Sequence, residues 1–154
     1  MTGHDDVEAT ESHTTRAVDQ VDAIHWHGYT LVAAAQTVPT PADRAIRLAA
    51  EPETVLTSPD AVGTWVAKQI RSHGDRAELW ISSTGQWTNQ VNSDSTPGWP
   101  TLETECALRA AQARSVYAAA WTAHATSRFE VFAEAVTARE CPVQGDHLDG
   151  RRQR

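Results

Sequence analysis

Thr101–Cys141 reads TLETECALRAAQARSVYAAAWTAHATSRFEVFAEAVTAREC and contains neither glycine nor proline. Pro100 precedes it and Pro142 follows it, and alanine and other residues of good helix propensity fill it. Apolar side chains from Leu102 to Trp121 recur at three- and four-residue steps and would share one face of a helix. The stretch therefore predicts helix and makes this region the spine of the fold.

A single straight helix of this length would extend about 60 Å, which exceeds the width of a domain of this size. The apolar stripe also changes phase across Thr122–Ser127, where weaker helix formers stand. Ser127 and Glu130 have the spacing of a capping box. We therefore predict two helices, about 101–123 and 127–140, folded back on each other, with one bent helix as the alternative.

The totals describe one domain of ordinary composition. The chain has 154 residues, 40% of them hydrophobic, and a net charge of −7. The acidic balance counts against nucleic-acid binding, and no apolar run is long enough for a membrane span. We expect a cytoplasmic protein with no specific nucleic-acid partner and no membrane partner. Arginine supplies almost all the basic residues, which indicates a GC-rich bacterial, plasmid or phage genome.

The polar composition of the two ends predicts disordered tails at 1–14 and 142–154, around a single globular domain at 15–141. Within the domain, apolar residues at helical spacing predict a helix at about 16–37, and capping residues predict helices at about 40–50 and 58–73. Two strands, 78–82 and 87–91, follow around a turn, and 53–57 is a candidate third strand. The expected fold is α+β, mainly α. Four or five helices, with a C-terminal helical pair, pack on a small hairpin or three-stranded sheet.

His25-Trp26-His27-Gly28 is the sharpest motif. On a strand, His25 and His27 would point to one face and could bind one metal ion, whereas on a helix they diverge by about 200°. The helical pattern predicted here therefore argues against metal. The four letters resemble the first copper-ligand motif of multicopper oxidases, but the chain has no second His-x-His and no room for cupredoxin domains.

Two cysteines cannot form a disulfide framework. If the predicted helices fold back near Ala125, Cys106 and Cys141 would lie at the same height. We interpret them as buried thiols in a reducing cytoplasm. A redox pair or half of a metal site is the alternative, and His124, at the proposed helix junction, is a further candidate ligand beside His25 and His27.

The chain has six tryptophans, but no phosphate loop, serine elbow or zinc-binding motif. Trp80 and Trp87 fall on the predicted hairpin and Trp99 in the following loop, where tryptophan is favoured for partner binding. We therefore expect a non-enzymatic adaptor or regulator without a cofactor. It would bind another protein through these tryptophans and self-associate through its C-terminal helices. The alternative is a small metal-binding protein or enzyme using His25 and His27.

Overall fold

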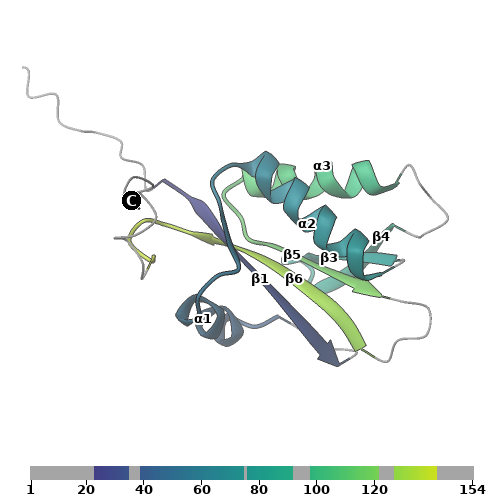
Figure 1. Cartoon of the computed structure of the whole chain (residues 1–154), viewed down its shortest axis with the longest axis horizontal. Coiled ribbons are helices and arrows are strands. Elements are labelled where there is room, and N and C mark those ends of the chain that lie inside the picture. Colours follow the sequence, from purple (N-terminus) through teal and green to yellow (C-terminus); the bar gives the residue numbers. More distant parts are fainter. Residues whose placement is uncertain (1–22, 35–38, 75, 92–97, 122–126, 142–154) are drawn as a thin grey trace, which may run out of the picture.

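The fold is built around one antiparallel sheet (Figure 1). The computed structural model describes residues 23–34, 39–74, 76–91, 98–121 and 127–141. The strands follow the spatial order β2-β1-β6-β5-β3-β4. In chain order the elements are β1 (His25–Ala34), α1 (Pro41–Ala49), β2 (Thr54–Leu56), α2 (Pro59–His73), β3 (Arg76–Ile81), β4 (Gln86–Val91), α3 (Gly98–Ala111), β5 (Val116–Trp121) and β6 (Ser127–Val136).

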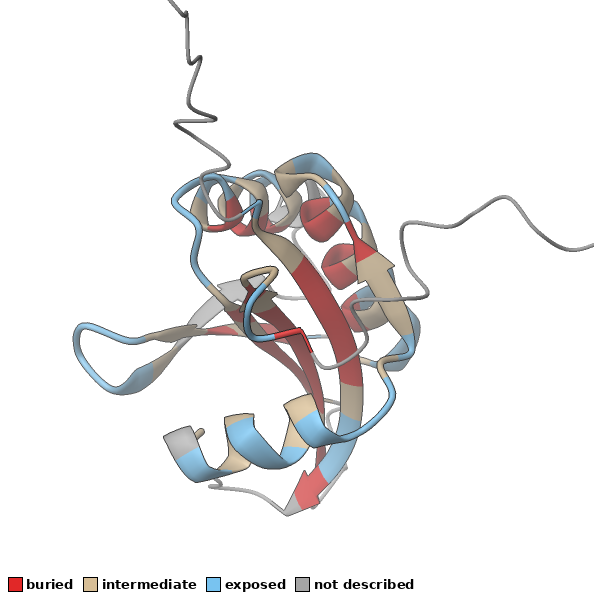
Figure 2. Cartoon of the chain, turned by 90° about the vertical axis from the view of Figure 1, so that its left-hand side faces the viewer, coloured by how far each residue is buried: buried red, intermediate tan, exposed pale blue. Residues whose placement is uncertain are grey.

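The helices lie on opposite faces of the sheet. α2 and α3 pack against each other and cover one face, whereas α1 lies alone on the other (Figure 1). Burial follows this arrangement, since α2 has a buried inner side and α1 is only half-buried at best (Figure 2). We call the two sides of the sheet the helix-pair face, under α2 and α3, and the α1 face.

Several local predictions are confirmed. Thr40 caps α1 through a capping box with Asp43, and Ser58 caps α2, which ends before Gly74. The hairpin of β3 and β4 forms around the predicted turn. The candidate strand at 53–57 forms as β2, but it pairs with β1 at the far side of the sheet and not with the hairpin.

The prediction of a mainly helical fold is wrong. The described residues contain three helices and a six-stranded sheet, in place of four or five helices on a hairpin. The predicted C-terminal helical pair does not exist. Helix α3 ends at Ala111, and Ala113 adopts a positive φ of 59°, the left-handed conformation that often closes a helix. Glycine usually occupies this position, so an alanine there gave no sign of the break.

The region after Ala113 forms strands because both of its faces are buried. β5 places three consecutive alanines, 118–120, in the middle of the sheet, all with at most 1% of their surface exposed. Alanine disfavours strands weakly, and burial on a central strand overrides that preference. In β6 charged and apolar residues alternate, with Glu130 and Glu134 on one face and Val131 and Ala133 on the other. This period of two was the strand signal in the sequence.

The predicted helix at 16–37 is also wrong where the structure describes it, because His25–Ala34 is a strand. It pairs along its whole length with β6. Gly28 marks a close approach of this strand to α2, since a Cβ built there would lie 2.8 Å from Cη2 of Trp65. The missing side chain thus lets the indole ring lie directly on the strand.

The hydrophobic core lies between the helix-pair face and the two helices. Val62, Val66 and Ile70 of α2, together with Leu102 and Cys106 of α3, are fully buried there. The sequence correctly placed the α3 residues on one apolar stripe. Within the described residues, no helix is long and apolar enough to cross a membrane. The predicted terminal tails lie outside the described ranges.

Candidate metal centre

Two histidines and a cysteine meet on the α1 face. His25 Nε2 lies 3.0 Å from His27 Nε2, and Cys141 Sγ lies 3.7 Å from His27 Nε2. One ligand atom from each residue falls within 4.8 Å of the other two. His27 and Cys141 are buried and His25 is partly buried. This grouping of donor atoms is the candidate functional site.

The strand period brings the histidines together. His25 and His27 are two residues apart on β1, so their side chains leave the same face. This is the geometry that the sequence analysis required for a shared metal ion and that the helix prediction had ruled out.

Cys141 follows β6 and is far from β1 in the sequence. β6 runs beside β1 with His25 opposite Val136, and the backbone then turns back over the site. Thr137 and Glu140 stabilise that turn, since the Thr137 amide donates to Glu140 Oε2 and the Cys141 amide donates to the Thr137 carbonyl. The pKa of the Glu140 carboxyl is lowered by the backbone hydrogen bond from Thr137 and by Arg44.

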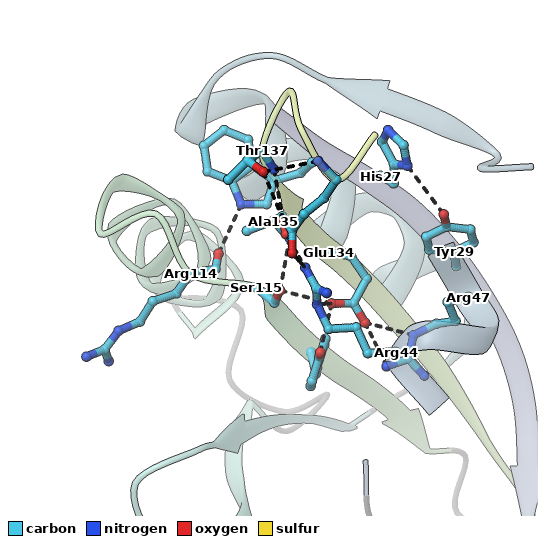
Figure 3. A network of polar contacts seen from close by, with 12 residues as sticks. His27, Tyr29, Arg44, Arg47, Arg114, Ser115, Glu134, Ala135 and Thr137 are labelled. Atoms are coloured by element: carbon cyan, nitrogen blue, oxygen red, sulfur yellow. Dashed lines mark hydrogen bonds and ion pairs between the residues drawn. The ribbon is translucent and has the colours of Figure 1, made fainter. Parts of the chain in front are cut away.

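Tyr29 supports the ring of His27 from the side away from Cys141. Its hydroxyl oxygen lies 3.4 Å from His27 Nδ1 (Figure 3). The same oxygen lies 3.5 Å from the carbonyl oxygen of Ala50, at the end of α1. When the hydroxyl donates to Ala50, it accepts the proton of His27 Nδ1. The Nε2 lone pair of His27 then points at the candidate site, which is the usual arrangement for a ligating histidine.

The two donor separations that involve His27 Nε2 are close to those of a tetrahedral ion. With zinc–nitrogen bonds of about 2.0–2.1 Å and a zinc–sulfur bond of about 2.3 Å, ligand atoms lie about 3.3 Å apart for two nitrogens and about 3.6 Å for nitrogen and sulfur. The observed separations of 3.0 and 3.7 Å bracket these values. Two imidazoles and a thiolate form a donor set that suits zinc and other borderline-soft ions.

A buried carboxylate network adjoins the site (Figure 3). Glu134 stands opposite His27 in the strand register and has no exposed side-chain surface. Arg47 Nε donates to its Oε1 at 2.8 Å, and Tyr117 and Ser115 donate to Oε2. Arg44 adds an ion pair at 3.5 Å. Burial and the charge of Glu134 raise the pKa of Tyr117 to about 12, so its hydroxyl remains a donor at neutral pH.

A second buried ion pair lies farther along β6. Arg128 Nη2 lies 2.6 Å from Glu130 Oε1, and both side chains are nearly inaccessible. The guanidinium also lies over the ring of Trp87, 4.3 Å from its centre. Charge on the α1 face is therefore neutralised locally along β6.

The structure describes some of the other predicted site residues. Trp80 and Trp87 pair across the hairpin, with ring centres 5.3 Å apart in an edge-on arrangement. Trp99 lies in the first turn of α3 and not in a loop, and its side chain is outside the described residues. His124 also lies outside them.

The two cysteines do not lie together, contrary to the helical-hairpin model. Cys106 belongs to the helix-pair core, where burial raises the pKa of its thiol to about 12. Cys141 belongs to the histidine cluster. Sequence reasoning did not identify Tyr29 as part of the site. It also did not predict that Cys141 lies beside His27. The alternation of β6 was the signal that could have revealed the strand pairing that brings these two residues together.

Comparison of the chain with protein-family models, with curated proteins and with solved structures found no match. The site is therefore interpreted from its own residues and geometry.

Proposed function

We propose that this protein binds a thiophilic divalent metal ion, with Zn²⁺ the best fit, through His25, His27 and Cys141. The observation that carries the proposal is the convergence of two imidazole nitrogens and one thiol within 4.8 Å. This replaces the expectation of a protein without metal, which depended on a helical path for residues 16–37.

The ion would join the two ends of the described fold. His25 and His27 begin β1, and Cys141 follows β6. Bound metal would hold the turn after β6 against the start of β1 and stabilise the folded state by mass action. Three protein ligands leave one position of a tetrahedral ion for water or an added ligand.

Cobalt titration tests the donor set. Co²⁺ in place of Zn²⁺ reports thiolate ligation through a charge-transfer absorption band, and tetrahedral geometry through its visible bands. We expect stoichiometric binding by the reduced protein, displaced by Zn²⁺. Cys141→Ala should abolish the thiolate band, and His25→Ala and His27→Ala should weaken binding by about tenfold or more.

Cys106 supplies the matched control, because it is the other buried thiol and belongs to the opposite face. Cys106→Ala should retain the full cobalt spectrum. A reduced, folded wild-type protein that binds neither Co²⁺ nor Zn²⁺ would refute the metal proposal.

A protein-interaction role at Trp80, Trp87 and Trp99 is our second proposal. It is supported by the position of the Trp80–Trp87 pair on the outermost hairpin of the sheet, where both side chains are partly exposed. Native mass spectrometry of the protein from its own host would test it by identifying a second chain at fixed stoichiometry. Trp87→Ala should then release that chain. We also place the protein in the cytoplasm, where a reducing environment keeps Cys141 available as a ligand.

A further inference from the structure

One edge of the sheet is only partly covered. β2 pairs with β1 over three positions, Trp26 to Gly28. Glu53 extends the hydrogen bonding along this edge of β1 as far as Thr30. Its amide donates to the Gly28 carbonyl and its carboxylate accepts from the Thr30 amide. Within the described residues, no strand pairs with this edge of β1 beyond Thr30.

Backbone groups at the uncovered edge point outward. In an antiparallel sheet, alternate residues direct their amide and carbonyl groups to the same side. Gly28 and Thr30 use theirs toward β2 and Glu53, so Val32 presents its own to the open edge. The side chains there are unusually exposed for aliphatic residues, at 68% for Val32 and 52% for Leu31. Exposed apolar edges are templates for strand pairing.

A pocket opens beside the same stretch of β1. It has a volume of about 330 Å³ and lies between α1 and the strands. Its walls are mostly apolar and include Leu31 and Phe132 from the sheet and Ile46 from α1. Ile46 is 70% exposed. The pocket can accept one apolar side chain of a molecule lying along the edge.

The margin of the pocket is acidic. Asp43 lines it, and the Glu53 carboxylate is bound to Thr30, which also lines it. The hydrogen bonds from Thr40 lower the pKa of Asp43, so it is ionised at neutral pH. Arg47 also borders the pocket, but Glu134 and Glu140 together balance Arg47 and its neighbour Arg44. The uncompensated charge at this edge is therefore negative.

We propose that the open edge of β1 binds an extended, basic peptide segment of a partner protein by strand addition. Its backbone pairs with Val32, one apolar side chain enters the pocket under α1, and a basic side chain faces Asp43 and Glu53. This recognition mode combines backbone hydrogen bonds for affinity with a side-chain pocket for specificity.

The acidic margin favours such a partner over a second copy of this chain. Two copies paired edge to edge would bring their Asp43 and Glu53 carboxylates toward each other, and like charges at close range oppose association. The proposal is independent of metal binding, because none of the three metal-ligand candidates lines the pocket.

The test uses a fluorescein-labelled synthetic probe with alternating valine and threonine, one central leucine and flanking lysines. We expect its fluorescence anisotropy to rise with added full-length protein. A probe N-methylated on the amides of one edge retains charge and side chains but cannot pair on that edge. With the edge that faces β1 methylated, it should bind about tenfold more weakly, as expected for the loss of two or three hydrogen bonds. A probe with glutamates in place of lysines should also bind more weakly.

Val32→Pro removes the outward amide while leaving the β1–β6 hydrogen bonds in place, and proline is tolerated on strand edges. It should weaken probe binding to the same degree, whereas Val32→Thr, which keeps the amide, should stay within about twofold. The methylated probes keep the test valid if the proline variant fails to fold.

Equal binding of the parent and all N-methylated probes would overturn strand addition. A dimer in sedimentation velocity that Val32→Pro disperses, without probe binding by the wild type, would identify a second copy as the occupant and overturn the partner peptide.

Discussion

Both faces of the sheet bury side chains, but they are built from different chemistry. On the helix-pair face, Leu79 and Val131 are fully buried among other aliphatic side chains. On the α1 face, Glu134, Arg128 and His27 are buried to the same extent. Burial alone therefore does not distinguish the two faces.

What differs is how each buried group is stabilised. The apolar face gains free energy from the area removed from water, which is insensitive to the identity of single atoms. The α1 face depends on matched donors and acceptors around each charge, so the loss of one partner leaves another charge buried and uncompensated. Such a face can hold ligand atoms in fixed positions, and the candidate metal centre lies on it.

Glu134→Gln should destabilise the α1 face and cause the largest loss of folding stability. The variant keeps the side-chain volume but leaves the guanidinium group of Arg47 without its carboxylate and Arg44 with Glu140 alone. We expect a loss of about 3–5 kcal/mol in the free energy of unfolding, measured by urea denaturation. Glu140→Gln, at a 45% exposed partner of Arg44, is the control and should cost less than about 1 kcal/mol. Similar small losses for both variants would contradict the contrast between the faces.

Leu79→Ala should destabilise the helix-pair face and cause the next largest loss of folding stability. Leu79 is fully buried in the core, so truncation should cost about 2–5 kcal/mol in unfolding free energy. The volume-conserving Leu79→Met should cost less than about 1.5 kcal/mol. Isosteric replacement would then be tolerated on one face and not on the other. A large loss for Leu79→Met would contradict this difference.

Gly28→Ala should strain the contact between β1 and α2. The added Cβ would lie 2.7 Å from Thr54 Cγ2 and 2.8 Å from Trp65 Cη2. We expect a loss of about 1–3 kcal/mol by thermal or urea unfolding. Combining it with Thr54→Ser, which removes Cγ2, should recover part of the loss. Unchanged stability in Gly28→Ala would show that the strand and helix adjust freely.

Alkaline pH should lower the free energy of unfolding gradually, through one buried group on each face. The effect is smallest near neutral pH. The pKa values of Tyr117 and Cys106 are raised to about 12, from ordinary values of 10.0 and 9.0, mainly by burial. The unfolded chain therefore loses these protons first. Their stabilising contribution is complete below about pH 9 and is lost as pH rises toward 12. Denaturation midpoints of the wild type, Tyr117→Phe and Cys106→Ala across this pH range measure how much each group contributes to the loss of stability. Midpoints that stay constant from pH 9 to 12 would contradict these shifts.

The success of the sequence predictions followed the range of the interactions behind them. Thr40 and Ser58 cap α1 and α2 through residues three positions away, so local patterns identified both helices. The turn before Gln86 is equally local and gave the hairpin. The strands β1, β5 and β6 pair with partners far along the chain, and the local sequence patterns favoured helix for all three.

The metal-ligand candidates show the same division. The sequence indicated that His25 and His27 could share an ion only on a strand, which is a local rule. Whether the segment was a strand depended on β6, about a hundred residues later, and the position of Cys141 depended on the turn that follows β6. Tyr29 was not selected because its role depends on the end of α1.

By itself, the sequence determined the local elements whose signals lie within a few residues: two capped helices, a hairpin that carries Trp80 and Trp87, and the apolar stripe of α3. Only the tertiary structure decided that the alanine-rich C-terminal region forms central strands, because burial on both faces outweighs the helix propensity of alanine. The same packing brought Cys141 to the histidines of β1. Contacts between distant segments form only in the folded chain, and they assemble the candidate metal centre.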